Sequence, residues 1–100
     1  MKTNKQQIIP NEIIHLVADI NYTTIFFIDG SSFYSSYTLG YFEKKYTLPS
    51  NFLRISRSTI INTDFLGKIK IEEGKMYAYL QNGNCFKISR RKTVLFSKFV

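Results

Sequence analysis

The chain has 100 residues, of which 44% are hydrophobic and 16% aromatic, so we expect one small soluble domain that is too short for a second core. The polar start MKTNKQQIIP carries no secretory signal, and apolar runs such as Ile25–Ile28 are too short to cross a membrane. A single cysteine, Cys85, excludes an intrachain disulfide, and with a single histidine, His15, it leaves little material for a zinc site or a catalytic triad.

The net charge of +7 lies entirely in the second half of the chain. Residues 1–50 carry four cations and four anions, whereas residues 51–100 carry ten cations and three anions. All four arginines occur there, at positions 54, 57, 90 and 91. So one-sided a charge indicates a polyanionic partner, either nucleic acid or an anionic membrane surface. The alternative is a basic face that serves only solubility.

We expect a flexible lead over residues 1–7 and one folded domain over residues 8–100. In the first half of this domain, turn residues at short intervals predict antiparallel hairpins. We predict strands at Ile13–Ala18, Tyr22–Ile28 and Phe33–Tyr37. The apolar residues of Thr38–Tyr46 then recur at helical spacing, which predicts one short amphipathic helix.

The segment after this helix contains the first arginine pair. Leu53 and Ile55 alternate with Arg54 and Ser56, which is typical of a strand that buries one pair and projects the other. We expect Ser58 to cap a short turn at residues 59–62.

The last third predicts a three-stranded meander and a helix. The strands are expected at Lys68–Glu72, Met76–Leu80 and Cys85–Ile88, and the Asn82-Gly83 pair is expected to supply the positive φ angles of a tight turn. From Arg90 to Val100 the spacing predicts a helix, capped by Ser89, with Leu95, Phe96 and Phe99 on one face.

The residues that could support catalysis have simpler explanations. Glu72 and Glu73 begin a turn flanked by lysines, which favours a solvated position over acid–base work. His15 lies in an apolar strand, and Cys85 is expected to be a packed thiol, with a redox role left open. We therefore predict no enzyme activity, no metal and no cofactor.

The second basic cluster breaks a local rule. Arg90, Arg91 and Lys92 occupy the first turn of the last predicted helix, where the helix dipole disfavours cations. A bound phosphate would resolve this conflict, because backbone N–H groups and guanidinium groups would bind it together. Alternatively, the arginines pair with Asp64, Glu72 or Glu73.

Several spaced motifs resemble the LytTR DNA-binding domain of bacterial transcription regulators over residues 8–100. They are Phe52-x-Arg54-x-Ser56-Arg57-Ser58-x-x-Ile61-Asn62, then Ile69, Asn82-Gly83 and Ile88-Ser89-Arg90-Arg91, with Asn21-Tyr22-Thr23 upstream. This chain has Ser56 where the family usually has histidine.

The resemblance implies a mainly β (α+β) fold of elongated antiparallel sheets and hairpins, with one or two short helices and a C-terminal helix. It also implies that loops, not a recognition helix, enter successive major grooves of DNA. The residues that it assigns to bases are Arg57, Arg90, Asn21 and Tyr22. The residues assigned to phosphates are Arg54, Ser58, Thr23, Lys68, Arg91 and Lys92.

Our leading hypothesis is a cytoplasmic, stand-alone transcription regulator that binds double-stranded DNA as two protomers on direct repeats. A regulatory protein partner is a further expectation, no membrane insertion is expected, and Met1 with its short polar lead favours a complete small protein. One rival is a non-specific binder of RNA or single strands, which would need two or three aromatic rings exposed on the basic face. The other is a basic domain that docks an acidic protein or an anionic membrane.

Overall fold

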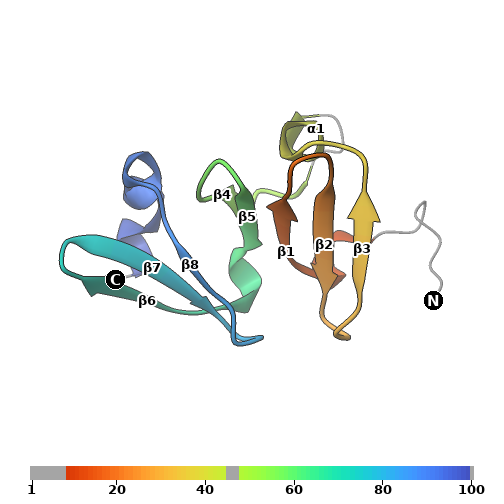
Figure 1. Cartoon of the computed structure of the whole chain (residues 1–100). Helices are drawn as coiled ribbons and strands as arrows, with labels where there is room; N and C mark the ends of the chain where they lie inside the picture. Colours follow the sequence, from red (N-terminus) through yellow and green to blue (C-terminus); the bar gives the residue numbers. More distant parts are fainter. Residues whose placement is uncertain (1–8, 45–47, 100) are drawn as a thin grey trace.

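All strands that the structure describes pair antiparallel, in two sheets (Figure 1). The computed structural model describes residues 9–44 and 48–99, and its extents are 41 × 24 × 23 Å. The elongated, mainly β fold predicted from the family resemblance is therefore confirmed. The predicted lead at residues 1–7 and the end of the predicted first helix, beyond Lys44, lie outside the described residues.

The larger sheet has the strand order β3-β2-β1-β5-β4 and the smaller one the order β6-β7-β8. The larger sheet consists of β1 (Ile13–Ala18), β2 (Thr23–Phe27), β3 (Ser32–Ser35), β4 (Phe52–Arg54) and β5 (Thr59–Asn62). The smaller sheet consists of β6 (Leu66–Glu72), β7 (Lys75–Leu80) and β8 (Cys85–Lys87). The helical segments are η2 (Pro10–Glu12), α1 (Leu39–Lys44), η3 (Thr63–Phe65) and η4 (Arg90–Phe99), of which only α1 is an α-helix.

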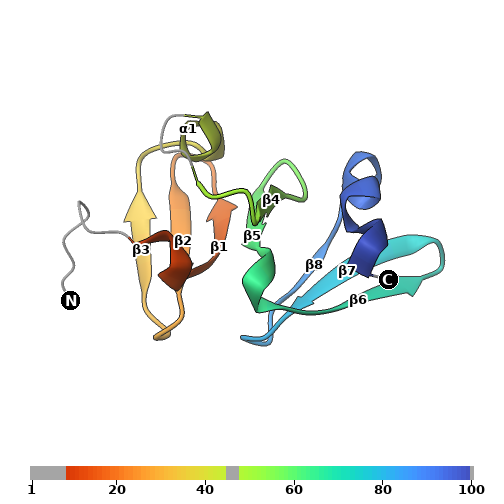
Figure 2. The same cartoon turned by 180° about the vertical axis from the view of Figure 1, so that it is seen from behind.

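Both views place α1 at one end of the larger sheet and η4 beside the smaller sheet (Figures 1 and 2). Six of the predicted strands are present, with bounds shifted by at most two residues at either end. The alternation of apolar and polar residues, together with the turn residues between them, was sufficient to locate them.

The predicted turn at residues 59–62 is wrong, because this segment is strand β5 and all four of its residues are buried. It pairs with β1 on one side and with β4 on the other. Ser58 therefore precedes a strand instead of capping a turn. A strand buried on both faces shows no alternation in its sequence, which is why its pattern was misinterpreted.

The buried residues form two clusters instead of the single expected core, and β5 belongs to both. Ile60 packs with the cluster under α1, whereas Ile61 packs with the cluster between the two sheets and η4. In β1 an irregularity between Ile13 and His15 lets Ile13 and Leu16 face the first cluster while Ile14 faces the second. Two shared strands thus allow a short chain to bury apolar side chains on both sides of one sheet.

The predicted Asn82-Gly83 hairpin has one positive φ angle, whereas the full pair expected of a tight turn occurs at the β6–β7 hairpin. Glu73 and Gly74 have φ angles of 52° and 78°, as the two central residues of a tight type I′ turn require. In the Asn82-Gly83 pair, only Gly83 has a positive φ, at 92°, and the Asn82 side chain accepts a hydrogen bond from the Asn84 N–H.

The C-terminal helix η4 is a 3-10 helix, so its faces differ from those predicted. With three residues per turn, Leu95 lies on the face of Lys92 and Lys98 and is 40% exposed. Phe96 is completely buried in the cluster between the sheets. The predicted apolar face is therefore wrong for Leu95, and the side chain of Phe99 lies outside the described residues.

Asn62 at the end of β5 is a completely buried polar side chain with three hydrogen bonds. Its amide donates to the Ile13 carbonyl at 2.8 Å, and its Oδ1 accepts from the Asn51 amide at 2.7 Å and the Asp64 N–H at 2.9 Å. These bonds tie β5 to the start of β1, to the segment before β4 and to η3.

We expect Asn62→Ala to lower the free energy of unfolding by about 2–4 kcal/mol, because it leaves buried donors and acceptors without partners. The matched control is Asn82→Ala, which removes one similar bond at an exposed turn and should cost less than about 1 kcal/mol. Chemical denaturation measures both variants. Equal losses would contradict the importance of the buried network.

His15 lies between the two sheets, 1% exposed, and stacks on Phe26 at 4.3 Å between ring centroids. It also contacts Phe86 of the smaller sheet at 5.0 Å. Its Nδ1 atom is buried without a hydrogen-bond partner among the described residues, and burial lowers the pKa of His15 to about 4. The ring is therefore neutral at physiological pH and acts as a packing residue.

The free energy of unfolding should fall as the pH drops from about 6.5 to about 4, by about 3 kcal/mol from this residue. The sign follows because the unfolded chain, with an ordinary histidine pKa, takes up the proton at higher pH than the folded chain does. Denaturation curves of the wild type and His15→Leu at several pH values measure the difference. A parallel pH dependence in the two proteins would contradict this assignment.

Candidate nucleic-acid interface

Three loops that carry most of the predicted contact residues lie along one edge of the molecule (Figures 1 and 2). They are the β1–β2 loop, the β4–β5 loop and the junction between β8 and η4. Backbone hydrogen bonds join them, since Ala18 N–H donates to the Ser58 carbonyl and Ser89 N–H donates to the Ile55 carbonyl, each at 2.8 Å. The β4–β5 loop therefore contacts both of the others.

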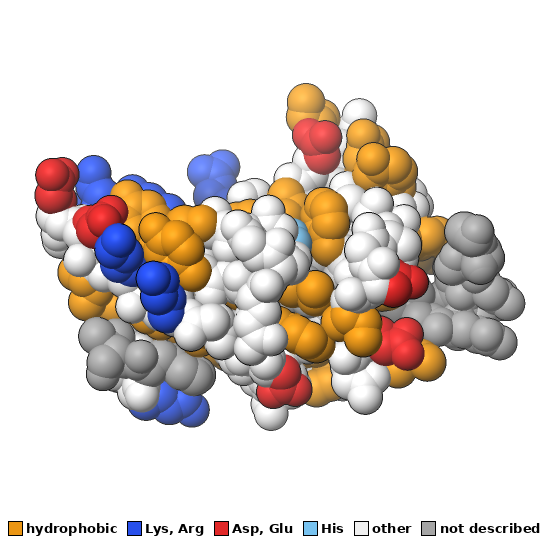
Figure 3. All heavy atoms as spheres, turned by 90° about the horizontal axis from the view of Figure 1, so that it is seen from below, with side chains coloured by type: hydrophobic (Ala, Val, Ile, Leu, Met, Phe, Trp, Pro, Cys, Tyr) orange, Lys and Arg blue, Asp and Glu red, His pale blue; other side chains and the backbone are white. Residues whose placement is uncertain are grey.

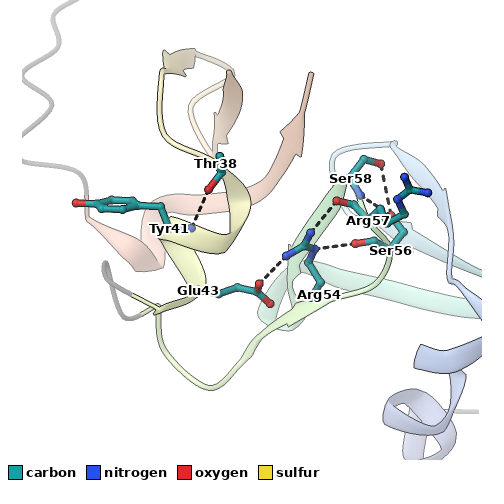
Figure 4. Close-up of polar contacts among 7 residues, drawn as sticks. All are labelled: Thr38, Tyr41, Glu43, Arg54, Ser56, Arg57 and Ser58. Carbon is teal, nitrogen blue, oxygen red and sulfur yellow. Dashed lines mark hydrogen bonds and ion pairs between the residues drawn. The ribbon is translucent and has the colours of Figure 1, made fainter. Parts of the chain in front are cut away.

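Arg57 is at the tip of the β4–β5 loop and is exposed. Its guanidinium makes no hydrogen bond or ion pair within the part of the chain that the structure describes, and Figure 4 shows it pointing away from Arg54. Ser58 is also exposed, and its N–H donates to the Ser56 hydroxyl at 3.2 Å. The loop thus presents a free guanidinium on a backbone that is itself hydrogen-bonded.

Arg54 has a different environment from Arg57. It forms an ion pair with Glu43 of α1 at 2.5 Å, and two of its nitrogens donate to backbone carbonyls of its own loop. The pairing considered from the sequence, with Asp64, Glu72 or Glu73, is not the one formed. No sequence signal pointed to Glu43, which lies eleven residues earlier in another element. The expected phosphate contact of Arg54 stays a prediction.

The β1–β2 loop exposes Asn21 and Tyr22. Its backbone is closed by the Asp19 N–H, which donates to the Tyr22 carbonyl at 2.7 Å, and the Tyr22 ring packs edge-on against Tyr34 at 5.3 Å. Thr23, expected at a phosphate, is instead completely buried, and its hydroxyl donates to the Tyr37 carbonyl at 2.7 Å. Thr23 is the first residue of β2, and its hydrogen bond ties the end of the β1–β2 loop to the segment after β3.

The third loop leads into η4, where Arg90 and Arg91 are exposed and Lys92 is half-buried. The Lys92 N–H donates to the Ser89 carbonyl at 2.9 Å, and the Thr93 hydroxyl donates to the Arg90 carbonyl at 3.0 Å. These bonds hold the first turn, so three cations are clustered at a helix start as predicted. Neither arginine side chain has a partner among the described residues.

A groove of about 400 Å³ separates the β1–β2 loop from the β4–β5 loop. Its walls include Asn21 and Tyr22 on one side and Arg54 and Arg57 on the other. The segment Tyr37–Gly40, between β3 and α1, also lines it and was missed in the sequence, where it was assigned only to a strand end and a helix start.

The basic residues of the second half are divided between this edge and the outer face of the smaller sheet. Lys68 extends from that outer face, where its Nζ lies 5.3 Å from the centroid of the Tyr79 ring, so it is not brought together with the three loops. Figure 3, seen from below, shows basic, acidic and apolar side chains together on this part of the surface. Neighbouring Glu72 pairs with Lys70 at 3.3 Å, so part of the positive charge is compensated.

Other polar groups on this face have ordinary partners. A hydrogen bond to Glu72 raises the pKa of Lys70, and a hydrogen bond to Cys85 raises the pKa of Tyr79. Cys85 is exposed, not packed as expected.

Within residues 9–44 and 48–99, no three metal-binding side chains cluster. None of the helices described there is long and apolar enough to span a bilayer.

The exposure of aromatic rings bears on the single-strand alternative. Among the described aromatic residues, the exposed ones are Tyr22, Tyr34 and Tyr37, which belong to the larger sheet and its loops. On the smaller sheet, Tyr77, Tyr79 and Phe86 are half-buried. The exposed rings lie in the electrically neutral half of the sequence and away from the lysine-bearing face, but Tyr22 and Tyr37 line the groove that Arg57 also lines.

Comparison with known proteins agrees with this geometry. A family model described as the LytTr DNA-binding domain matches residues 5–100. Among solved structures, one described as the LytTr DNA-binding domain of a response regulator from Bacillus cereus matches with a TM-score of 0.78, at 23% sequence identity. That match covers 92% of this chain and 84% of the other, and shows a shared fold. A search of curated proteins gave no match. The predicted family resemblance is thereby confirmed.

Proposed function

Because this chain belongs to the LytTR family of DNA-binding domains, which act in transcription regulation, we propose that it recognises a specific sequence in double-stranded DNA. The observation that carries the proposal is the hydrogen-bonded edge of three loops, each of which presents polar side chains to solvent. The molecule is 41 Å long, which exceeds one helical turn of DNA, about 34 Å, so a molecule of this length can lie across two successive major grooves.

Arg57 and Arg90 are the proposed base contacts. Each is exposed and forms no ion pair among the described residues, and a guanidinium can bond guanine O6 and N7 together. Asn21 or Tyr22 would contact a third position. Ser58, Arg91 and Lys92 would bind phosphates, which fix the register without distinguishing bases, and Lys68 would add a more distant phosphate contact.

The exposed tyrosines keep a single-stranded nucleic acid as the second candidate partner. A stacking surface needs aromatic rings among the cations that bind the backbone, and Tyr22 and Tyr37 line one groove with Arg57. The family of the chain favours duplex DNA over this alternative. We further propose a cytoplasmic regulator without enzyme activity or cofactor, which binds direct repeats as two protomers and responds to a regulatory protein.

Selection from random duplexes with this chain should enrich one sequence motif. Binding to the enriched duplex should be tighter than to unrelated duplex by at least about a thousandfold, as for other specific DNA-binding domains. Competition with unrelated duplex, single-stranded DNA and RNA measures the preference. Equal competition by all three, or binding only to anionic vesicles, would contradict the proposal.

Arg57→Ala and Arg90→Ala should each relax selection at one base pair, at a cost of about 1–3 kcal/mol in discrimination. Arg91→Ala is the matched comparison from the same helix turn. It should weaken binding to all duplexes alike and reduce the slope of log K against log salt by about 1. Titrations at several salt concentrations separate the two effects. If Arg57→Ala and Arg90→Ala both kept the wild-type base preference, the proposed base contacts of these two arginines would be refuted.

A further inference from the structure

Arg54 at the end of β4 makes three directed contacts with the rest of the protein (Figure 4). Its Nε donates to the Ser56 carbonyl at 2.7 Å, and a second nitrogen donates to the Arg57 carbonyl at 2.8 Å. The remaining terminal nitrogen pairs with the Glu43 carboxylate at 2.5 Å. The side chain is 23% exposed, so the guanidinium is largely enclosed by these partners.

These contacts use the planar geometry of the guanidinium. Its donors diverge in a fixed fork, so two carbonyls of one loop and a carboxylate from another element can be bound at once. The carbonyls of Ser56 and Arg57 lie between β4 and β5, and no backbone N–H of the described residues donates to them. Arg54 therefore supplies the hydrogen bonds that the sheet does not supply, and Glu43 fixes the guanidinium from the side of α1.

The same loop connects the other parts of the interface. The Ser58 carbonyl accepts from Ala18, next to the β1–β2 loop, and the Ile55 carbonyl accepts from Ser89, next to Arg90. A loop that changed its conformation would therefore displace both neighbours. Fixing it before DNA arrives reduces the ordering cost that binding would otherwise include.

We propose that Arg54, fixed by Glu43, is a positioning residue that holds the Ile55–Ser58 loop in the conformation that directs Arg57 to DNA. This inference rests on the proposed function. It replaces the expected phosphate contact of Arg54 with an indirect role, in which Glu43, an acid on α1, contributes to DNA selectivity.

The two roles predict opposite effects of removing the acid. If Arg54 bound phosphate, Glu43→Gln would release a cation and tighten binding to every duplex. If Arg54 positions the loop, Glu43→Gln loosens it and lowers the preference for the selected duplex. The matched control is Glu12→Gln, which removes the same charge from an exposed residue before the start of β1, at the end of the strand away from the β1–β2 loop.

The experiment compares the full chain with Glu43→Gln, Arg54→Gln and Glu12→Gln, using the duplex selected by the wild type and an unrelated duplex over a range of salt. We expect Glu43→Gln and Arg54→Gln each to lose about tenfold in the ratio of the two affinities, since this corresponds to a modest ordering cost. Their salt slopes should stay at the wild-type value. Glu12→Gln should keep the wild-type ratio.

A second measurement needs no DNA. The N–H groups of Ile55 and Ser58 are hydrogen-bonded at this loop. Their amide hydrogen exchange should accelerate in Glu43→Gln and Arg54→Gln, while the amides of β5 keep their protection if the fold is intact. Both variants are titrated only under conditions in which denaturation curves show them folded.

Three results would overturn the inference. The first is tighter binding of all duplexes by Glu43→Gln than by Glu12→Gln. The second is a salt slope reduced by about 1 in Arg54→Gln. The third is an affinity ratio that is unchanged in both Glu43→Gln and Arg54→Gln. Failure of the wild type to select any duplex is a separate result, which refutes the proposed function before the variants are compared.

Discussion

Burial of β5 on both faces is the constraint on which the rest of the structure depends. Ile60 and Ile61 belong to different apolar clusters, so this one strand holds the larger sheet against α1 on one side and against the smaller sheet on the other. Moving β5 by one residue would exchange the two faces and disturb both clusters. Asn62 adds a polar constraint on the same register, because its buried amide has partners in three other segments.

The fixed position of β5 also fixes the Ile55–Ser58 loop that precedes it. The Ile55–Ser58 loop enters β5 directly, starts from β4 and is closed by Arg54. Its position therefore follows from the packing of the strand and from a short network of hydrogen bonds. The β1–β2 loop and the β8–η4 junction are attached to it through backbone bonds. The exposed arginines thus stand on a scaffold with little freedom, as a binding surface that depends on geometry requires.

Residues whose environment is local could be predicted well. The hairpins follow from alternating apolar residues and turns. The exposure of Arg57 follows from its place in a loop, and that of Arg90 and Arg91 from their place at a helix start. Residues whose environment depends on distant partners could not be predicted in this way. Thr23 was expected to face DNA and is buried, Ser58 was expected to cap a turn and precedes a strand, and Glu43 was missed. In each case the deciding neighbour lies in an element far along the chain.

The sequence by itself determined that the chain is mainly β, that its positive charge lies after residue 50, and that its motifs resemble those of LytTR domains. These properties depend on residue type, order and short-range spacing. Only the tertiary structure decided which cations share an edge. It pairs Arg54 with Glu43 and leaves the Arg57 guanidinium without a partner among the described residues. It also divided the charge between that edge and the outer face of the smaller sheet. The physical reason is that an ion pair or a buried hydrogen bond depends on distances of a few ångströms, and packing sets those distances between segments that are remote in sequence.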